Sequence, residues 1–413
     1  MKNTNRSSLI SSLKISRNLR INYGLIFIFY LWQYAYNWPG LRLDRLIGNS
    51  KFIDLSGIIS AIPCFQTLGN DIYKTNNAGG LCSGFIYSTD LLRILAFLQI
   101  DTTDVVWLGF VFGGAFILML LHEIYLINPI HNRLNFLILA AVLSPGIWLL
   151  LERGNFDIPI IILIYLSALT LRTKVEWLSV ALISLSAVMK YYTLPLLILI
   201  VLISKNKFTK LLSILSLIFL IPHLFGLYKK VNAFPSTWFV SFGIDALPLY
   251  FNRFLQLFNL ETHTLSYSEI KIVGIAITVI YYSCFRKSIG IFSESVVNNL
   301  LSRFDTRIVQ IHLFSTSAFL TCYFGGINYD YRLAFLVISL ISSLIFENVK
   351  YFLQFRSLVI ISLIFSTFTF GLFGLIGAVL QLIGDIALIP VICFQTTYMV
   401  KTIYLKSIKS YTA

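Results

Sequence analysis

Long apolar runs follow one another along almost the whole chain, and this pattern restricts the fold more than any other feature. A helix that crosses a bilayer needs about 20 predominantly apolar residues, and such runs recur from residue 21 to residue 400. Only 12% of the 413 residues are charged, about half of the fraction that is usual in soluble domains. The pattern predicts a single all-α integral membrane domain over residues 1–413 and excludes an ordinary soluble fold.

About 12 transmembrane helices are expected, within a range of about 10 to 13. Residues 1–20 are polar and basic, and no small-residue cleavage site follows the first apolar run, so a signal peptide is not expected. The two largest loops are residues 39–103 and 229–270. The expected spans are residues 21–38, 104–127, 134–151, 158–171, 176–189, 192–204, 209–228, 271–285, 309–324, 332–346, 357–373 and 375–400.

Residues 176–204 allow either one long span or two short spans separated by the sequence KYYTLP. Pro195 disfavours helix at the residue before it, and Lys190 is costly at a bilayer centre. With the break, cytoplasmic segments hold 20 of the 32 Lys and Arg residues; without it they hold 13. Because Lys and Arg collect in cytoplasmic loops, we expect two short spans, cytoplasmic termini, residues 205–210 in the cytoplasm and the loop 229–270 outside.

The polar clusters of the chain all fall on the external side in this topology. Non-helical backbone at membrane depth survives only where protein or a watery cavity covers it, so the clusters predict one external site. The net charge of +14 follows from the cytoplasmic loops and needs no nucleic-acid partner. We expect an integral protein of the bacterial inner membrane. The clusters are residues 39–103, ERGNFD at 152–157, KYYT at 190–193, residues 229–270 and GGINYDYR at 325–332.

The loop 39–103 carries two acidic candidates. Asp54 begins an apolar, helix-like stretch, where it is either an N-cap or a general base. Asp71 lies in LGNDIY, a turn-like sequence, and is either a solvated charge or a second base. Cys64 and Cys82 share this loop, and a disulfide between them is open if the loop lies in an oxidising compartment.

Cations stand at the outer ends of three expected spans. Arg153 in ERGNFD either pairs with Glu152 or binds a phosphate, which arginine contacts as a bidentate fork. Lys190 either snorkels to the interface or adds a point charge to the same site. Arg332 ends NYDYRL, beside Asp330. The five histidines show no metal-ligand spacing, and phosphate-binding and dinucleotide-binding loops are missing, so no metal or cofactor is predicted.

The order of these motifs resembles the GT-C membrane glycosyltransferases, and most of all glycosyltransferase family 87. In that family an aspartate begins the first external loop, as Asp54 does here. A Gly-x-Asp-x-Tyr-like element follows, which matches Gly69, Asp71 and Tyr73 in LGNDIY, and then a Tyr-Pro-Pro-like element, which matches Tyr87 in GFIYS.

The later motifs of the family are a Gly-Gln-x-Asn-like turn and a Lys-x-x-Pro-like break. Here the turn falls on Arg153, Gly154 and Asn155, and the break falls on Lys190 and Pro195 with two extra residues between them. The prolines after the tyrosine and the glutamine after the glycine are missing. The resemblance covers roughly residues 20–205, about half of the chain.

The resemblance implies a transferase of cell-envelope polysaccharide biosynthesis that takes a sugar from a polyprenyl-phosphate donor. The acceptor would be a hydroxyl of a lipid-linked or glycan acceptor, on the external face. Arg153, Lys190 and Arg332 would bind the donor phosphate. Asp54 would be the base, with Asp71 as the second candidate. The residues expected to orient the sugars are Tyr73, Tyr87, Asn155, Asp157, Tyr191, Tyr192 and Asp330.

Two other functions stay open from the sequence. An O-antigen or exopolysaccharide polymerase would place its chemistry in the loop 229–270, around Arg253 and His263. A carrier or flippase of lipid-linked sugars would show related halves with broken helices in corresponding places, whereas the sequence predicts one break, in its first half.

Overall fold

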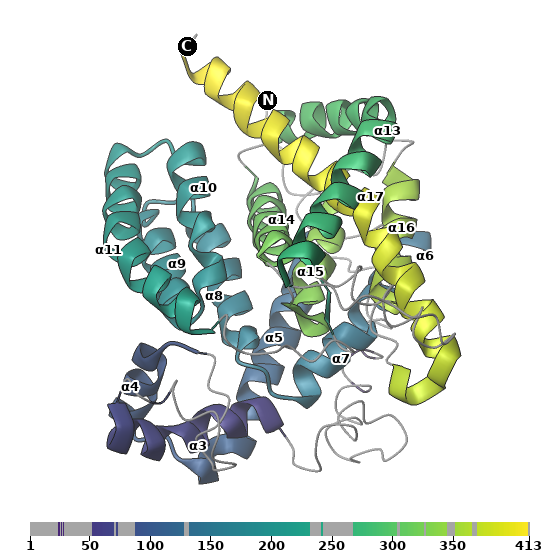
Figure 1. The fold of residues 1–413 in the computed structure, drawn as a ribbon. Helices are drawn as coiled ribbons and strands as arrows, with labels where there is room; N and C mark the ends of the chain where they lie inside the picture. Colours follow the sequence, from purple (N-terminus) through teal and green to yellow (C-terminus); the bar gives the residue numbers. More distant parts are fainter. Residues whose placement is uncertain are drawn as a thin grey trace, which may run out of the picture.

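A computed structural model describes most of the chain, and the element labels below are those of Figure 1. The described residues are 24, 26, 28, 52–69, 72, 87–127, 132–231, 241–242, 267–303, 306–325, 328–344, 352–365 and 370–411. They are helical apart from turns and one short antiparallel ladder, in which β1 (Ser241–Phe242) pairs with β2 (Asn328–Tyr329). The expectation of an all-α architecture is confirmed for this part of the chain.

The helices of the described residues vary widely in length. They are α3 (Ile53–Leu68), α4 (Thr89–Phe97), η3 (Thr102–Asp104), α5 (Val105–Ile127), α6 (Asn132–Val142), α7 (Pro145–Glu152), α8 (Asp157–Thr170), α9 (Trp177–Met189), η4 (Tyr191–Thr193), α10 (Pro195–Ile203), α11 (Lys207–Val231), α13 (Tyr267–Ser302), α14 (Arg307–Phe324), η6 (Asp330–Leu333), α15 (Ala334–Ser343), α16 (Phe352–Phe365) and α17 (Phe370–Tyr411).

Three helical segments of the described residues are long and apolar enough to cross a membrane: Thr102–Ile127, Ile272–Ile291 and Val379–Lys406. These segments support a membrane protein. Other apolar helices are shorter, such as α8 with 14 residues, which is about 21 Å long against a hydrocarbon thickness of about 30 Å. The expected count of about 12 full spans is therefore not matched by helix length.

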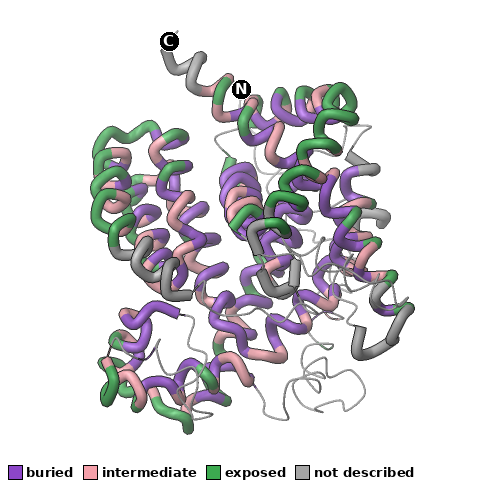
Figure 2. The backbone as a smooth tube through the Cα atoms, in the orientation of Figure 1, coloured by how far each residue is buried: buried purple, intermediate pink, exposed green. Residues whose placement is uncertain are grey.

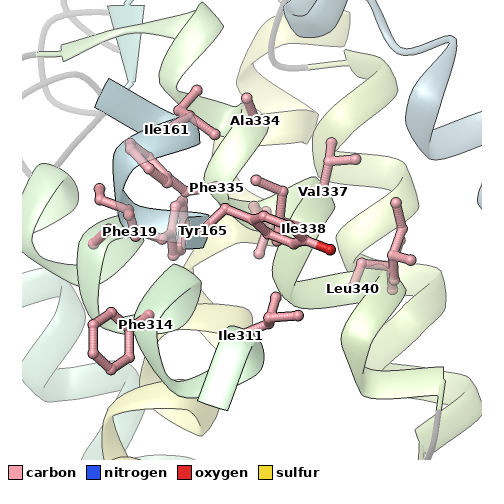
Figure 3. Packing of buried hydrophobic residues seen from close by; sticks show 14 of the residues in the cluster. Ile161, Tyr165, Ile311, Phe314, Phe319, Ala334, Phe335, Val337, Ile338 and Leu340 are labelled. Atoms are coloured by element: carbon pink, nitrogen blue, oxygen red, sulfur yellow. The ribbon is translucent and has the colours of Figure 1, made fainter. Parts of the chain in front are cut away.

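The largest hydrophobic core lies where α8, α14 and α15 meet. Figure 3 shows Ile161 and Tyr165 of α8 among side chains of the other two helices, including Phe319 and Phe335. Every residue of α15 is buried, and Figure 2 shows the same concentration of buried chain at the centre. A helix that is apolar on all sides belongs in an interior, so α15 is a central helix that neighbouring helices surround.

The helices α8 to α11 form an up-and-down group at one side of the molecule (Figure 1). Asp157, which begins α8, bonds Lys190, which follows α9. Arg172, which follows α8, donates to the carbonyl of Ile203 at the end of α10 over 2.7 Å. Thus α8 and α10 run in the same direction and α9 runs against them. The chain reverses at residues 190–194, and the expected break is confirmed.

The same contacts define two ends of the molecule. The carbonyl of Ile203 also accepts a hydrogen bond from Lys406 of α17, so residues 205–210 lie at the same end as this C-terminal segment. The Asp157–Lys190 contact lies at the opposite end, together with α3 and α4 (Figure 1). This placement agrees with the sidedness expected from the charges. Which compartment each end faces stays a prediction.

Several helix boundaries differ from the expected ones. The run 134–151 is two helices, because Ser144 adopts an extended conformation before Pro145, which starts α7. The helix α13 continues through CFRKS to Ser302, because a few polar residues without proline do not end a helix. The boundary expected at residue 374 lies inside α17.

Helices α3 and α4 form within the loop 39–103 and share a second hydrophobic cluster with the start of α5. Ile58, Ile59 and Ile62 are buried in this cluster, as their spacing on one helix face predicts. Cys64 on α3 is disulfide-bonded, and Cys82 lies outside the described residues, as does nearly all of the loop 229–270.

Candidate functional site

Asp54 and Arg153 form an ion pair between the first turn of α3 and the end of α7. The Arg153 Nε donates to both Asp54 oxygens over 3.0 and 2.9 Å, and Nη2 donates to Oδ1 as well. Charge-assisted pairs with this fork geometry are among the strongest side-chain contacts. The N-cap position of α3 is Phe52, which makes no capping side-chain bond, so the hypothesis that Asp54 is an N-cap is wrong.

Two backbone hydrogen bonds, called the backbone joint below, hold the residues of this ion pair in position. The amides of Phe52 and Asp54 donate to the carbonyls of Glu152 and Arg153 over 3.3 and 3.1 Å. Phe52 has a φ of 54°, which is unfavourable for a bulky residue and persists only where the surroundings fix it. A Cβ at Gly154 would lie 2.8 Å from the Phe52 Cβ, so the joint closes only with glycine at this position.

Gly109 of α5 provides the second half of the space that Phe52 occupies. A Cβ at Gly109 would lie 2.5 Å from the Phe52 ring, and this ring packs edge-on against Phe110 at a centroid distance of 5.7 Å. Contacts of Phe52 with α5 and with the α7–α8 turn therefore fix the start of α3, and with it the position of Asp54.

Asp157 is fully buried and accepts hydrogen bonds from three residues on two segments of the chain. Its Oδ1 accepts from Lys190 Nζ and from the Tyr192 hydroxyl, both over 2.7 Å. Its Oδ2 accepts from Arg332 Nε of η6 over 3.1 Å. A buried charge is tolerated when it is paired and hydrogen-bonded, and Asp157 meets this condition. It brings two of the three predicted phosphate-binding cations together.

Lys190 lies between α9 and η4, with only 5% of its side chain exposed, so the hypothesis that it snorkels to an interface is wrong. Its Nζ lies 4.5 Å from the centroid of the Tyr87 ring, and Arg332 lies 4.9 Å from the centroid of the Tyr192 ring. Aromatic faces attract cations at such distances.

Asn155 links the carboxylate of Asp54 to the backbone of Asp157. Its Nδ2 donates to Asp54 Oδ2, and its Oδ1 accepts from the backbone amide of Asp157 over 2.8 Å. Asn155 is fully buried. The ion pair and the Asp157 contacts are therefore one hydrogen-bonded unit, called the charged cluster below: Asp54, Arg153, Asn155, Asp157, Lys190, Tyr192 and Arg332.

The charged cluster holds three cationic side chains against two carboxylates. It lies where helices begin, end or break, so several segments that are distant in sequence contribute one to three groups each. Among the described residues of the cluster the cations outnumber the carboxylates, and such a composition favours an anion with oxygen atoms. Arginine forks and a lysine ammonium are the side chains that bind phosphate groups most effectively.

The structure thus brings together most of the residues that the sequence singled out. Arg153 and Lys190, expected near each other, belong to the same cluster, and Tyr87 contacts it. Tyr191 is half-buried among hydrophobic side chains. Asp71, Tyr73 and the side chain of Asp330 lie outside what the structure describes.

The sequence reasoning missed the joint around Phe52. Gly154 carried a signal, because a glycine inside a polar turn is often there for a positive φ, and its φ is 56°. Gly109 lies in an apolar helix, and nothing in the sequence relates it to Phe52.

Comparisons of the chain with protein-family models, with curated proteins and with solved structures gave no match. Among the described residues, no three His, Cys, Asp or Glu side chains are grouped so that they could hold a metal ion. The functional conclusion therefore depends on the chemistry of the charged cluster and on the resemblance found in the sequence.

Proposed function

We propose that this protein is a membrane glycosyltransferase of the GT-C type. It transfers a sugar from a polyprenyl-phosphate donor to a hydroxyl of a lipid-linked or glycan acceptor. The observation that carries this proposal is the charged cluster, in which Arg153 bonds the carboxylate of Asp54 and Asn155 links this pair to Asp157 with its partners Lys190 and Arg332. The cluster offers the two things that this transfer needs, a site for a phosphate and a base.

The cations act on the donor. Arg153 binds phosphate oxygens through its fork, while Lys190 and Arg332 supply positive charge that the Asp157 carboxylate holds in place. Negative charge grows on the phosphate oxygen as the sugar leaves it, and cations already in position stabilise that charge without reorganising.

Asp54 acts on the acceptor. An alcohol is a weak nucleophile until a base takes its proton. The acceptor oxygen attacks the anomeric carbon, and the bond from that carbon to the phosphate oxygen breaks. The electron pair of this bond leaves with the polyprenyl phosphate, and the hydroxyl proton passes to Asp54. Asp71 stays the second candidate for this role.

The disulfide of Cys64 supports an external site. Disulfides persist in oxidising compartments, and Cys64 lies on α3, the same helix as Asp54. Residues 205–210 lie at the opposite end of the molecule, where the charge distribution predicts the cytoplasm. We therefore place the reaction at the external face of a bacterial plasma membrane.

A transfer assay with the protein in membranes and labelled polyprenyl-phosphate sugars tests the proposal. Asp54→Asn keeps the shape of the side chain and removes its basicity, so transfer should fall by at least about 10²-fold, since general-base assistance is worth about 10²–10⁴. Asp90→Asn is the matched control, because Asp90 forms an exposed pair with Arg93 over 2.7 Å on α4. This control should transfer at the parent rate.

Two outcomes would contradict the proposal. Parent-level transfer by Asp54→Asn would show that Asp54 is not the base. A parent protein that binds the lipid-linked sugar and moves it across vesicles, without transferring it to any acceptor, would instead be a carrier.

A further inference from the structure

The Asp54 carboxylate occupies the face of Arg153 that a phosphate would use. Both Asp54 oxygens accept from Arg153 Nε, and Oδ1 accepts from Nη2. Carboxylates and phosphates bind an arginine fork in the same way, through two oxygens. The same N–H groups cannot serve both anions fully at once.

We propose that the donor phosphate displaces Asp54 from Arg153, and that this exchange turns Asp54 into the active base. This inference rests on the proposed function. While Arg153 donates to both Asp54 oxygens, the guanidinium occupies the carboxylate, which is then not available to the hydroxyl of an acceptor. When a phosphate takes the guanidinium, Asp54 loses these bonds and becomes able to accept the proton of the acceptor hydroxyl.

The surroundings of Asp54 fit an exchange. Asn155 Nδ2 donates to Asp54 Oδ2 independently of Arg153, so one hydrogen bond still positions the carboxylate after the exchange. The backbone joint fixes the start of α3 without using the side chain of Asp54. The side chains of Arg153 and Asp54 are 13% and 15% exposed, so this pair is less enclosed than Asp157.

Asp157 shows what a permanent pair looks like in the same cluster. It is fully buried and bonds Lys190, Tyr192 and Arg332, so no ligand reaches it without opening the core. The two carboxylates therefore have different roles: Asp157 holds two cations in place, and Asp54 occupies the third until the donor arrives. The acceptor is then activated only after the donor has bound. Without the donor, water or an acceptor encounters Asp54 still paired with Arg153.

Binding of a short-chain polyprenyl phosphate to the full-length protein in nanodiscs tests the exchange without any need for turnover. If Asp54 competes with the ligand, its removal raises the fraction of protein that is ready to bind, and the apparent Kd falls by that fraction. Asp54→Asn should bind the probe at least about threefold more tightly than the parent. Asp54→Ser, which removes the carboxylate in another way, should do the same.

Variants of Arg153 show whether a tighter Kd comes from the proposed competition. Arg153→Gln should weaken binding, and adding Asp54→Asn to Arg153→Gln should give no tightening, because the competition needs the guanidinium. Asp90→Asn, which breaks the exposed pair on α4, should leave the Kd unchanged. Inorganic phosphate is the second probe: tightening with both probes places the exchange at the phosphate group, and tightening with the lipid alone shows that the prenyl chain is also needed.

Thermal melting of each variant shows whether it is folded. An unchanged or weaker affinity in folded Asp54→Asn and Asp54→Ser, with the parent still transferring sugar, would overturn the exchange and leave the proposed function standing. A parent that binds neither probe and transfers no sugar would overturn both.

Discussion

Two buried polar assemblies of this protein differ in charge and in position. The charged cluster contains five charged side chains and lies at helix ends and breaks. The second assembly, called the neutral network, lies in the middle of α14, α15 and α17. There the Tyr398 hydroxyl lies 2.7 Å from His312 Nε2 and 2.8 Å from Thr316 Oγ1, Thr316 lies 2.7 Å from Ser339 Oγ, and Gln395 donates to Ser339 over 3.1 Å.

This difference distinguishes a candidate functional site, the charged cluster, from a structural contact, the neutral network. The neutral network joins helices that packing has already positioned, and its groups bond mainly to one another, so it gives the core a unique arrangement. The charged cluster joins segments that are distant in sequence at helix ends and breaks, and among its described residues the cations outnumber the carboxylates. We infer that substitutions in the neutral network change only stability, whereas substitutions in the charged cluster can change stability and chemistry independently.

The largest effect is expected from Asp157→Ala, which leaves Lys190 and Arg332 buried without their shared carboxylate. Removing one partner of a buried ion pair costs about 3–5 kcal/mol, so the free energy of unfolding should fall by that amount and transfer should be lost. Thermal or denaturant unfolding in detergent measures it. An unfolding free energy near that of the parent would mean that the two cations have other partners or reach water.

A smaller effect is expected from Gly154→Ala. The alanine meets the Phe52 Cβ at 2.8 Å and also takes a φ of 56°. Overpacking of this kind costs about 1–3 kcal/mol, and the left-handed backbone adds about 1–2 kcal/mol. Because the backbone joint positions Asp54, the transfer rate per folded molecule should also fall. Thermal unfolding and the transfer assay measure the two effects separately.

Gly69→Ala is the matched control for that variant. Gly69 also has a φ of 56°, with a ψ of −129°, and a Cβ there would meet nothing within 4 Å, so it reports the cost of a positive φ without a clash with Phe52. A transfer rate per folded molecule that falls as much in Gly69→Ala as in Gly154→Ala would contradict a specific role of the Phe52 contact.

The smallest effect is expected from Tyr398→Phe in the neutral network. The substitution leaves His312 and Thr316 with one partner fewer, and an unsatisfied buried polar group costs about 1–3 kcal/mol. The melting temperature should drop while the transfer rate per folded molecule stays at the parent value. A changed rate or a changed Kd for polyprenyl phosphate would place this network within the site.

The sequence predicts the helical break at residues 190–194 well and other boundaries poorly. Lys190 and Pro195 oppose a continuous span for independent reasons. The break before Pro145 has only the proline signal, inside a strongly apolar run, and was missed. In α13 the polar stretch CFRKS lies within a continuous helix. Hydropathy indicates which residues contact lipid, whereas the end of a helix depends on backbone chemistry. The expected span ends and the observed helix ends therefore differ at these positions.

The candidate site was predictable as a group of residues and not as a set of pairs. Counting the Lys and Arg residues of cytoplasmic and external segments predicted that Arg153, Lys190 and Arg332 lie at one end of the molecule. That Arg153 would bond Asp54, 99 residues earlier in the chain, depends on how α3 packs against the α7–α8 turn. The positive φ of Phe52 follows from the same packing, and a phenylalanine gives no sign of it in a sequence.

The shortness of α8 and α10 has a consequence for the depth of the reaction. Measured from the end with Arg172 and residues 205–210, α8 with 14 residues and α10 with nine residues reach only about 21 Å and about 14 Å. A bilayer is about 30 Å thick in its apolar part. In the proposed orientation, Asp157 and Lys190 therefore lie roughly 10–15 Å below the outer headgroups. Under the proposed function, a polyprenyl phosphate would have to bring its charged end down to that level, and the depth of the site would then separate this donor from ordinary phospholipids.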